Sequence, residues 1–227
     1  MTKFLASVKN FDETKIVIDT PVDIIDLKNP NLGALGKIEH NEMIKICEYI
    51  NHNKTVSSTI GDIENSKEKI QQEVDLLSQL KIDIIKIGFF DESYCHLLEK
   101  IRSNKKLVIV FFADIFIPNE KVIKNLKKNN FYGFMIDTAH KKSGSLISYV
   151  SEKDIIRLKY FADSYNLKFG LAGSLKKDHI SYLKSFSPSY LGFRGALCNK
   201  DRNTEIDKDK LLEICSLLSN DKLSINF

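Results

Sequence analysis

The stretch Val22-Asp23-Ile24-Ile25-Asp26-Leu27-Lys28-Asn29-Pro30 decides how the fold of this chain is read. Its apolar run predicts a strand over 22–28 that stops before Pro30, because proline has no N–H to pair with a neighbouring strand. Side chains alternate along a strand, so Ile24, Asp26 and Lys28 share one face. Lysine is almost never fully buried unless it is paired, so a lysine in such a strand needs a reason.

The same pattern recurs in Asp83-Ile84-Ile85-Lys86-Ile87-Gly88, where Lys86 stands among isoleucines. One interpretation is that both are edge strands whose lysines reach solvent. The other is that two amines converge on a cavity at the carboxyl ends of parallel strands. Asp26 is then either a simple salt-bridge partner of Lys28 or a proton relay, and the two roles are compatible.

Strand-like runs alternate with helical periodicity along the whole chain. This alternation is typical of βα units, and eight of them in 227 residues fit a compact (β/α)₈ barrel. We therefore predict an α/β fold, a single TIM barrel that occupies residues 1–227 as one catalytic domain. The predicted strands are 4–8, 22–28, 55–60, 83–88, 107–112, 133–138, 168–172 and 190–194, and the predicted helices are 12–18, 42–51, 66–80, 92–102, one from about 118, 152–165, 178–185 and 210–218.

The composition narrows the class of protein. The 34 basic and 30 acidic residues leave a net charge of +4, too small and too dispersed to indicate nucleic-acid binding. No apolar run is long enough for a membrane span or a signal peptide, and the spacing of cysteines and histidines matches no zinc motif. We expect a cytoplasmic homo-oligomer with no metal and no cofactor, whose thiols stay reduced: Cys47, Cys95, Cys198 and Cys215.

Charged residues gather where the predicted strands end. The active site of a TIM barrel lies at that end, so these side chains are the candidate catalytic set. A lysine held among apolar groups has a lowered pKa and can attack a carbonyl to form an imine, while a second lysine or a carboxylate moves protons. The set comprises Asp26, Lys28, Lys86, Asp114, Asp137 and Lys141.

Glycines follow the last two predicted strands, where many TIM barrels bind phosphate. Gly173-Ser174 follows the seventh strand, and Gly195 follows the eighth. Glycine lets the backbone approach an anion closely, and backbone N–H groups then donate to it. Arg194 is either a charged donor to the phosphate or a member of an ion pair within the barrel.

Five segments of the chain together resemble the (5-formylfuran-3-yl)methyl phosphate synthase family of methanofuran biosynthesis. The D-x-K-N-P and A-G-S-[LI]-K-K patterns are the specific ones, and the similarity covers nearly the whole chain. The segments are 23–30 with Gly33-Ala34-Leu35-Gly36, Ile85-Lys86-Ile87-Gly88, Met135-Ile136-Asp137-Thr138-Ala139, 171–180, and 192–198 with Asp201-Arg202-Asn203.

The resemblance implies a lyase that condenses two molecules of glyceraldehyde 3-phosphate into a phosphorylated furan aldehyde, losing phosphate and water. It implies that Lys28 forms the Schiff base, that Lys86 transfers protons, and that Asp26, Asp137 and Lys141 complete the site. Two alternatives stay open from the residues alone. One is a Schiff-base aldolase acting on another sugar phosphate, and the other is a non-catalytic barrel that binds a phosphorylated metabolite.

Overall fold

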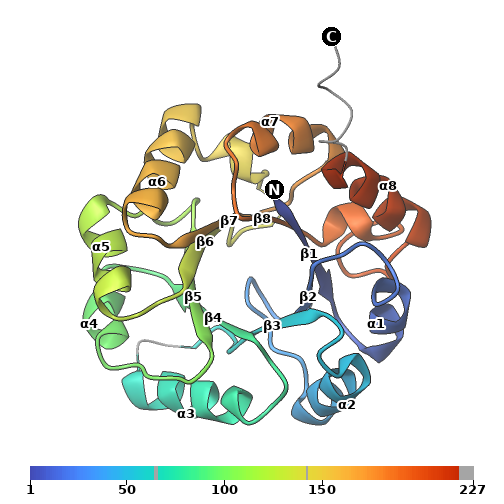
Figure 1. The fold of residues 1–227 in the computed structure, drawn as a ribbon, viewed down its shortest axis with the longest axis horizontal. Helices are drawn as coiled ribbons and strands as arrows, with labels where there is room; N and C mark the ends of the chain where they lie inside the picture. Colours follow the sequence, from blue (N-terminus) through green and yellow to red (C-terminus); the bar gives the residue numbers. More distant parts are fainter. Residues whose placement is uncertain (64–65, 142, 220–227) are drawn as a thin grey trace.

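The computed structural model describes residues 1–63, 66–141 and 143–219. Eight described strands, all parallel, close into a barrel in chain order, with β8 pairing with β1 (Figure 1). This confirms the predicted TIM barrel. The strands are β1 Lys3–Val8, β2 Ile24–Leu27, β3 Thr55–Thr59, β4 Ile84–Phe89, β5 Lys106–Phe112, β6 Gly133–Asp137, β7 Lys168–Leu171 and β8 Tyr190–Phe193.

Helices surround the barrel and cover its outer face (Figure 1). The outward-facing strand residues and the inner faces of the helices form the larger of two hydrophobic clusters, and a smaller cluster lies inside the barrel. The α-helices are α1 Phe11–Val17, α2 His40–Ile50, α3 Lys67–Ser78, α4 Tyr94–Leu98, α5 Glu120–Lys128, α6 Glu152–Ser164, α7 Ile180–Ser185 and α8 Lys208–Ser219; the 3₁₀ helices are η1 Leu146–Ser148, η2 Lys177–His179 and η3 Gly195–Leu197.

Two helix predictions were wrong in their bounds. The helix predicted over 92–102 is only α4, Tyr94–Leu98. The helix predicted from Pro118 begins at Glu120, because the side chain of Asn119 accepts a hydrogen bond from the N–H of Val122 and caps it. By contrast, the helix predicted over 152–165 closely matches α6, which Ser151 caps in a capping box with Asp154.

The strand register arranges the inward-facing residues of the described strands in six tiers. Alternate strands contribute to alternate tiers, as in other TIM barrels. From the end where the strands begin, the tiers are Lys3, Thr55, Lys106 and Lys168; Ile24, Ile84, Gly133 and Tyr190; Leu5, Ser57, Val108 and Gly170; Asp26, Lys86, Met135 and Gly192; Ser7, Thr59, Val110 and Ala172; and Lys28, Gly88, Asp137 and Arg194.

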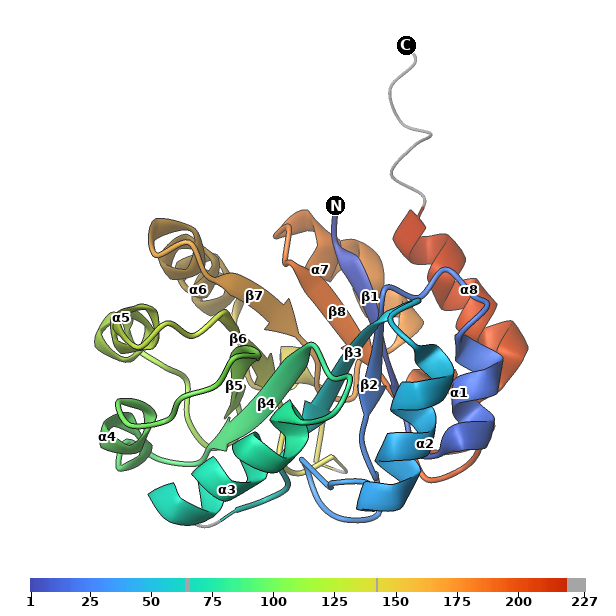
Figure 2. The same ribbon diagram turned by 60° about the horizontal axis from the view of Figure 1, so that its bottom comes forward.

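We call the opening beside the first tier the N-terminal mouth and the opening beside the sixth tier the C-terminal mouth. In Figure 2 the strands run away from the end where the N-terminus lies, toward the loops that follow each strand. The second and third tiers are apolar apart from Ser57 and the hydroxyl of Tyr190, and their side chains are buried. The fourth and sixth tiers hold the charges that the sequence analysis singled out.

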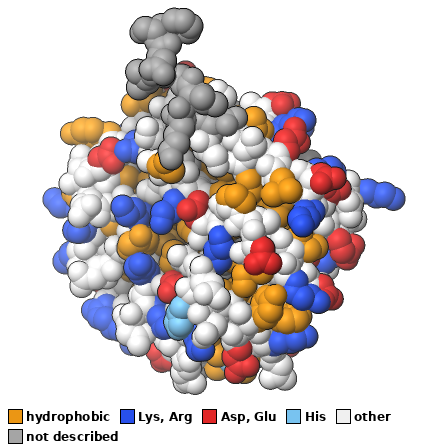
Figure 3. Space-filling view, turned by 45° about the vertical axis from the view of Figure 1, so that its right-hand side comes forward, with side chains coloured by type: hydrophobic (Ala, Val, Ile, Leu, Met, Phe, Trp, Pro, Cys, Tyr) orange, Lys and Arg blue, Asp and Glu red, His pale blue; other side chains and the backbone are white. Residues whose placement is uncertain are grey.

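Basic and acidic side chains are interspersed on the face that Figure 3 shows, over α8 and α1. No helix in the described part of the chain has the length and hydrophobicity needed to cross a membrane. All four cysteines are free.

Candidate active site

A cavity of about 680 Å³ opens at the C-terminal mouth. It gathers nine residues that the sequence analysis proposed, from five strands and the loops after them. These are Asp26, Lys28, Lys86, Asp137, Lys141, Gly173, Ser174, Arg194 and Gly195.

The deeper part of the site is an ion pair in the fourth tier. Lys86 Nζ lies 2.6 Å from Asp26 Oδ1, and both side chains are buried. Two buried serines also donate to Asp26: Ser57 Oγ to Oδ1 at 2.6 Å and Ser7 Oγ to Oδ2 at 2.9 Å. Three donors on one carboxylate fix its orientation.

The upper part of the site is a carboxylate between two lysines. Lys28 Nζ lies 3.4 Å from Asp137 Oδ2, and Lys141 Nζ forms a short ion pair with Asp137 Oδ1. The backbone N–H of Thr138 donates to the same Oδ1 at 2.7 Å. Asp137 is the last residue of β6, so its carboxylate stands at the rim, where Lys141 reaches it from the following loop.

The pairing of charges differs from the expected one. Asp26 was expected to pair with Lys28, its neighbour on the same strand face, but Asp26 pairs with Lys86 and Lys28 pairs with Asp137. The reason is the register: Asp26 and Lys86 share the fourth tier, whereas Lys28 and Asp137 share the sixth. The ion pairs therefore form between strands within one tier and not between neighbours along one strand.

Burial and neighbouring charges shift the pKa values of three of these groups. Burial lowers the pKa of Lys86, although the adjacent Asp26 carboxylate opposes the shift. Burial also lowers the pKa of Lys141 to about 8, against the pull of Asp137. Burial by itself would raise the pKa of Asp137, but the charges of Lys141 and Lys28 outweigh it and hold that pKa below its usual range. The site therefore contains amines that lose their protons more easily than exposed lysines do.

The turn after β7 has an unusual backbone conformation. Gly173 has φ +107° and Ser174 has φ +49°, so two successive residues lie in the left-handed region. A Cβ on Gly173 would lie 3.0 Å from the N of Thr138, too close for an ordinary side chain. The Ser174 hydroxyl donates to the carbonyl of Lys141 at 3.2 Å and so ties this turn to the loop of the catalytic set.

Arg194 is committed to an ion pair. Its guanidinium binds Glu13, with Nη2 3.0 Å from Oε1, and the Glu13 side chain is buried. The remaining donors of Arg194 go to backbone carbonyls of Ser7, Arg202 and Thr204. Of the two roles open to this residue, the structure shows the ion pair within the barrel.

Asp114 lies outside the cavity lining and fastens a loop. Its carboxylate accepts from the backbone N–H groups of Ala139 and His140, each at 2.7 Å, and lies 3.0 Å from His140 Nδ1. These bonds anchor the segment between Asp137 and Lys141. Asp114 thus supports the loop that presents Lys141.

Arg202 is a cavity residue that the sequence analysis quoted in a motif but gave no role. Its Nε is buried without a hydrogen-bond partner among the described residues. Burial lowers its pKa, and the charge of Asp137 opposes that shift. Arg202 stands in a loop after β8 with no periodicity to orient it, so sequence alone carried no signal for its position.

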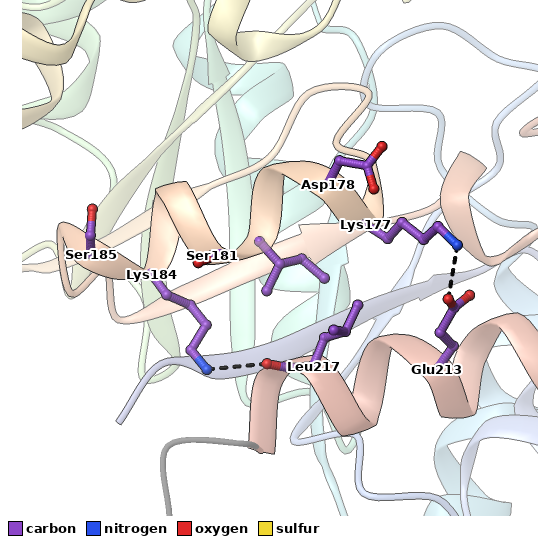
Figure 4. A pocket seen from close by; sticks show the side chains of 8 residues that line it. Lys177, Asp178, Ser181, Lys184, Ser185, Glu213 and Leu217 are labelled. Carbon is purple, nitrogen blue, oxygen red and sulfur yellow. Dashed lines mark hydrogen bonds and ion pairs between the residues drawn. The ribbon is translucent and has the colours of Figure 1, made fainter. Parts of the chain in front are cut away.

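A second hollow of about 690 Å³ lies on the outside of the barrel between α7 and α8 (Figure 4). Lys177 pairs with Glu213 at 2.9 Å across it, and Lys184 donates to the carbonyl of Leu217 at 3.2 Å. It contains none of the predicted site residues. Among the residues with described positions, no group of three or more His, Cys, Asp or Glu side chains could hold a metal ion.

Comparison with known proteins identifies the family. The profile of the 4-HFC-P synthase family matches residues 4–215. The chain belongs to this family. A (5-formylfuran-3-yl)methyl phosphate synthase of Methanocaldococcus jannaschii is 32% identical over 231 residues, covering 94% of this chain and 98% of that protein. The same enzyme of Methanococcus aeolicus is 29% identical over 225 residues, covering 92% and 96%.

Solved structures that resemble this 4-HFC-P synthase family member share its fold at low identity. A putative copper homeostasis protein CutC of Streptococcus agalactiae has a TM-score of 0.70 at 13% identity, covering 85% of this chain and 98% of its own. A phosphoribosyl anthranilate isomerase of Thermotoga maritima has a TM-score of 0.68 at 12% identity, covering 96% and 98%. At such identities the similarity concerns the barrel and not the chemistry.

Proposed function

We propose that this protein is a lyase that condenses two molecules of glyceraldehyde 3-phosphate into (5-formylfuran-3-yl)methyl phosphate in methanofuran biosynthesis. The atoms balance when one phosphate and two molecules of water leave. The observation that carries the proposal is the pair of lysine–carboxylate tiers at the C-terminal mouth, in a chain that belongs to the 4-HFC-P synthase family.

Lys28 is the proposed imine-forming lysine. Its amine lies in the sixth tier, nearest the mouth, and its ion pair with Asp137 is the longer of the two in these tiers, at 3.4 Å against 2.6 Å for Lys86 and Asp26. The amine nitrogen attacks the aldehyde carbon of the first substrate, and the carbonyl oxygen leaves as water. The resulting iminium withdraws electrons from the neighbouring carbon, so a proton there is lost more easily.

Lys86 and Asp26 are the proposed proton-transfer pair. They lie two tiers below Lys28, where a substrate carbon bound to Lys28 would meet them. The lowered pKa of Lys86 makes its ammonium lose a proton more easily, so that the free amine can act as a base, and Asp26 stabilises the ammonium that forms when it does. The enamine produced at Lys28 then forms the new carbon–carbon bond to the carbonyl carbon of the second molecule, whose oxygen takes up a proton.

Asp137 and Lys141 are proposed to assist the eliminations and the ring closure. The ammonium of Lys141 can give its proton to a leaving oxygen, because its pKa of about 8 leaves it protonated but acidic near neutral pH. Asp137 holds the ammonium of Lys141 in place. The backbone N–H groups of Gly173, Ser174 and Gly195 are the proposed phosphate donors, whereas the ion pair of Arg194 with Glu13 argues against a direct role for that residue.

The decisive experiment is incubation of the purified protein with glyceraldehyde 3-phosphate alone, followed by mass spectrometry and phosphate assay. We expect the furan aldehyde phosphate and one inorganic phosphate per product. A six-carbon sugar bisphosphate without phosphate release would indicate an aldolase instead. No turnover at all would indicate a barrel that only binds the metabolite.

A further inference from the structure

The N-terminal mouth contains a cavity of its own, of about 490 Å³. Three of the four first-tier residues that surround it are lysines: Lys3 from β1, Lys106 from β5 and Lys168 from β7. The tier geometry directs these side chains toward one axis from alternate strands. The residues that line this cavity include these three lysines and Lys184. No aspartate or glutamate is among the described residues that line it.

The three first-tier lysines have no carboxylate partner within 4.0 Å among residues 1–63, 66–141 and 143–219. Lys106 Nζ lies instead over the ring of Tyr132, 5.1 Å from its centroid. In the C-terminal mouth, by contrast, each catalytic lysine faces an aspartate. The positive charge of the N-terminal mouth is therefore left for something outside the described structure to balance.

Two acidic residues stand next to the starts of strands at this end, and both are turned to the backbone. Asp23 Oδ2 accepts from the N–H of Phe4 at 2.8 Å, and Asp83 Oδ2 accepts from the N–H of Val56 at 2.8 Å. Each carboxylate thus secures the start of a neighbouring strand. Neither forms an ion pair with the first-tier lysines.

The cavity has an apolar floor and a wall that carries polar groups. Ile24, Ile84 and Tyr190 close it, and all three are buried. The hydroxyl-bearing side chains of Thr55 and Ser189 also line the wall. A cavity with three ammonium groups, hydroxyls and no acidic lining residue is suited to an anion with several negatively charged oxygens.

We propose that the N-terminal mouth is a second binding site, separate from the catalytic cavity, for a compact multiply charged oxyanion of the phosphate-ester or diphosphate class. The anion lies on the barrel axis and contacts the ammonium groups of Lys3, Lys106 and Lys168. Because the lysines are partly exposed, the attraction is screened by salt and weakens as ionic strength rises.

The test is calorimetric titration of the full chain at low salt with inorganic pyrophosphate and, separately, with glycerol 3-phosphate. The two probes distinguish a diphosphate from a phosphate-ester ligand. The N-terminal-mouth variant carries Lys3→Gln, Lys106→Gln and Lys168→Gln. The matched control carries Lys121→Gln, Lys124→Gln and Lys128→Gln on the exposed side of α5, which removes the same charge elsewhere.

We expect the N-terminal-mouth variant to bind one of the probes at least about tenfold more weakly, since each lost charge pair contributes on the order of 1 kcal/mol in water. The control should bind within about twofold of the native protein, a factor well under 1 kcal/mol. Equal losses in both variants would show only a general attraction to a basic protein, and no loss in either would place all binding at the catalytic mouth. Either result overturns the proposal.

A measurement without substitutions guards against a variant that fails to fold. The native protein is treated with acetic anhydride with and without the probe that binds, and lysine acetylation is mapped by mass spectrometry. Protection of Lys3, Lys106 and Lys168, but not of Lys121, supports the site. Uniform acetylation in the presence of the bound probe overturns it.

Discussion

Both mouths of this barrel present lysines, but the two sets of lysines differ in burial and in ion pairing. At the C-terminal mouth, Lys28 and Lys86 are buried, with 7% and 3% of their surface exposed, and aspartates hold them. At the N-terminal mouth, Lys3, Lys106 and Lys168 are exposed and have no described carboxylate partner. The difference teaches that burial, and not lysine itself, lowers the pKa of an amine, because desolvation is the main cause of the shift at Lys86 and Lys141.

The largest expected effect follows from removing the proposed nucleophile. Lys28→Ala should lower kcat by about a thousandfold or more, since loss of a nucleophile removes the covalent route. Borohydride added during turnover should trap an adduct on the peptide containing Lys28 in the native protein and none in the variant. Lys121→Ala, on the surface of α5, is the control and should keep full activity. An adduct on Lys86 would reverse the roles proposed for the lysines of the fourth and sixth tiers.

The second effect is on stability, and it concerns the apolar tiers that separate the mouths. A Cβ on Gly170 would lie 2.1 Å from the ring of Tyr190. Gly170→Ala should therefore lower the free energy of unfolding by about 1–3 kcal/mol through overpacking. Gly195→Ala is the control, since a Cβ there meets nothing nearer than 3.8 Å. Denaturant unfolding measures the free energy of unfolding of both variants. Equal values would show that the second and third tiers can rearrange to accept the added methyl group at little cost.

The third prediction concerns the serines that hold Asp26. Ser57→Ala should lower kcat by about tenfold to a hundredfold, because a hydrogen bond to a charged group contributes roughly 1.5–3 kcal/mol. Ser58→Ala is the matched control: Ser58 is adjacent and buried, but its hydroxyl faces outward and lies 3.6 Å from Met43 Sδ. If both alanine variants lose activity equally, the loss comes from a general disturbance of β3 and not from the missing hydrogen bond to Asp26.

The smallest expected effect is on pH dependence. If Lys141 acts as an acid, kcat falls as pH rises through about 8, because the ammonium loses its proton there. Lys141→Arg keeps a positive charge at every accessible pH, so its activity, even if lower, should show no alkaline limb in that range. The measurement is a kcat profile from pH 6 to about 10 for both proteins. An unchanged limb in the variant would assign the titration to another group.

The sequence predicted the barrel because strand and helix periodicities are local properties of the chain. It also predicted which residues line the cavity at the C-terminal mouth, since strand ends of a parallel barrel converge. It did not predict that Asp26 pairs with Lys86, because that contact depends on the register between β2, β3 and β4. Asp114 was expected in the candidate catalytic set but lies outside the cavity lining, and Arg202 lines the cavity but was given no role. Both residues belong to loops, whose paths and hydrogen bonds leave no periodic signal in the sequence.

The pairing of Gly170 and Tyr190 has a consequence for the reaction. The ring of Tyr190 occupies the space that side chains at Gly170 and its neighbours would fill, and the isoleucines of the same tier are buried around it. We infer that no water passes along the barrel axis between the two mouths. Protons taken up by Lys86 then reach bulk solvent only through the C-terminal mouth, the same opening through which the substrates enter. Once substrate covers that opening, a proton abstracted by Lys86 stays with the enzyme. In heavy water the Lys86 ammonium then carries this proton beside two deuterons, so only part of the abstracted proton would return to the bound intermediate.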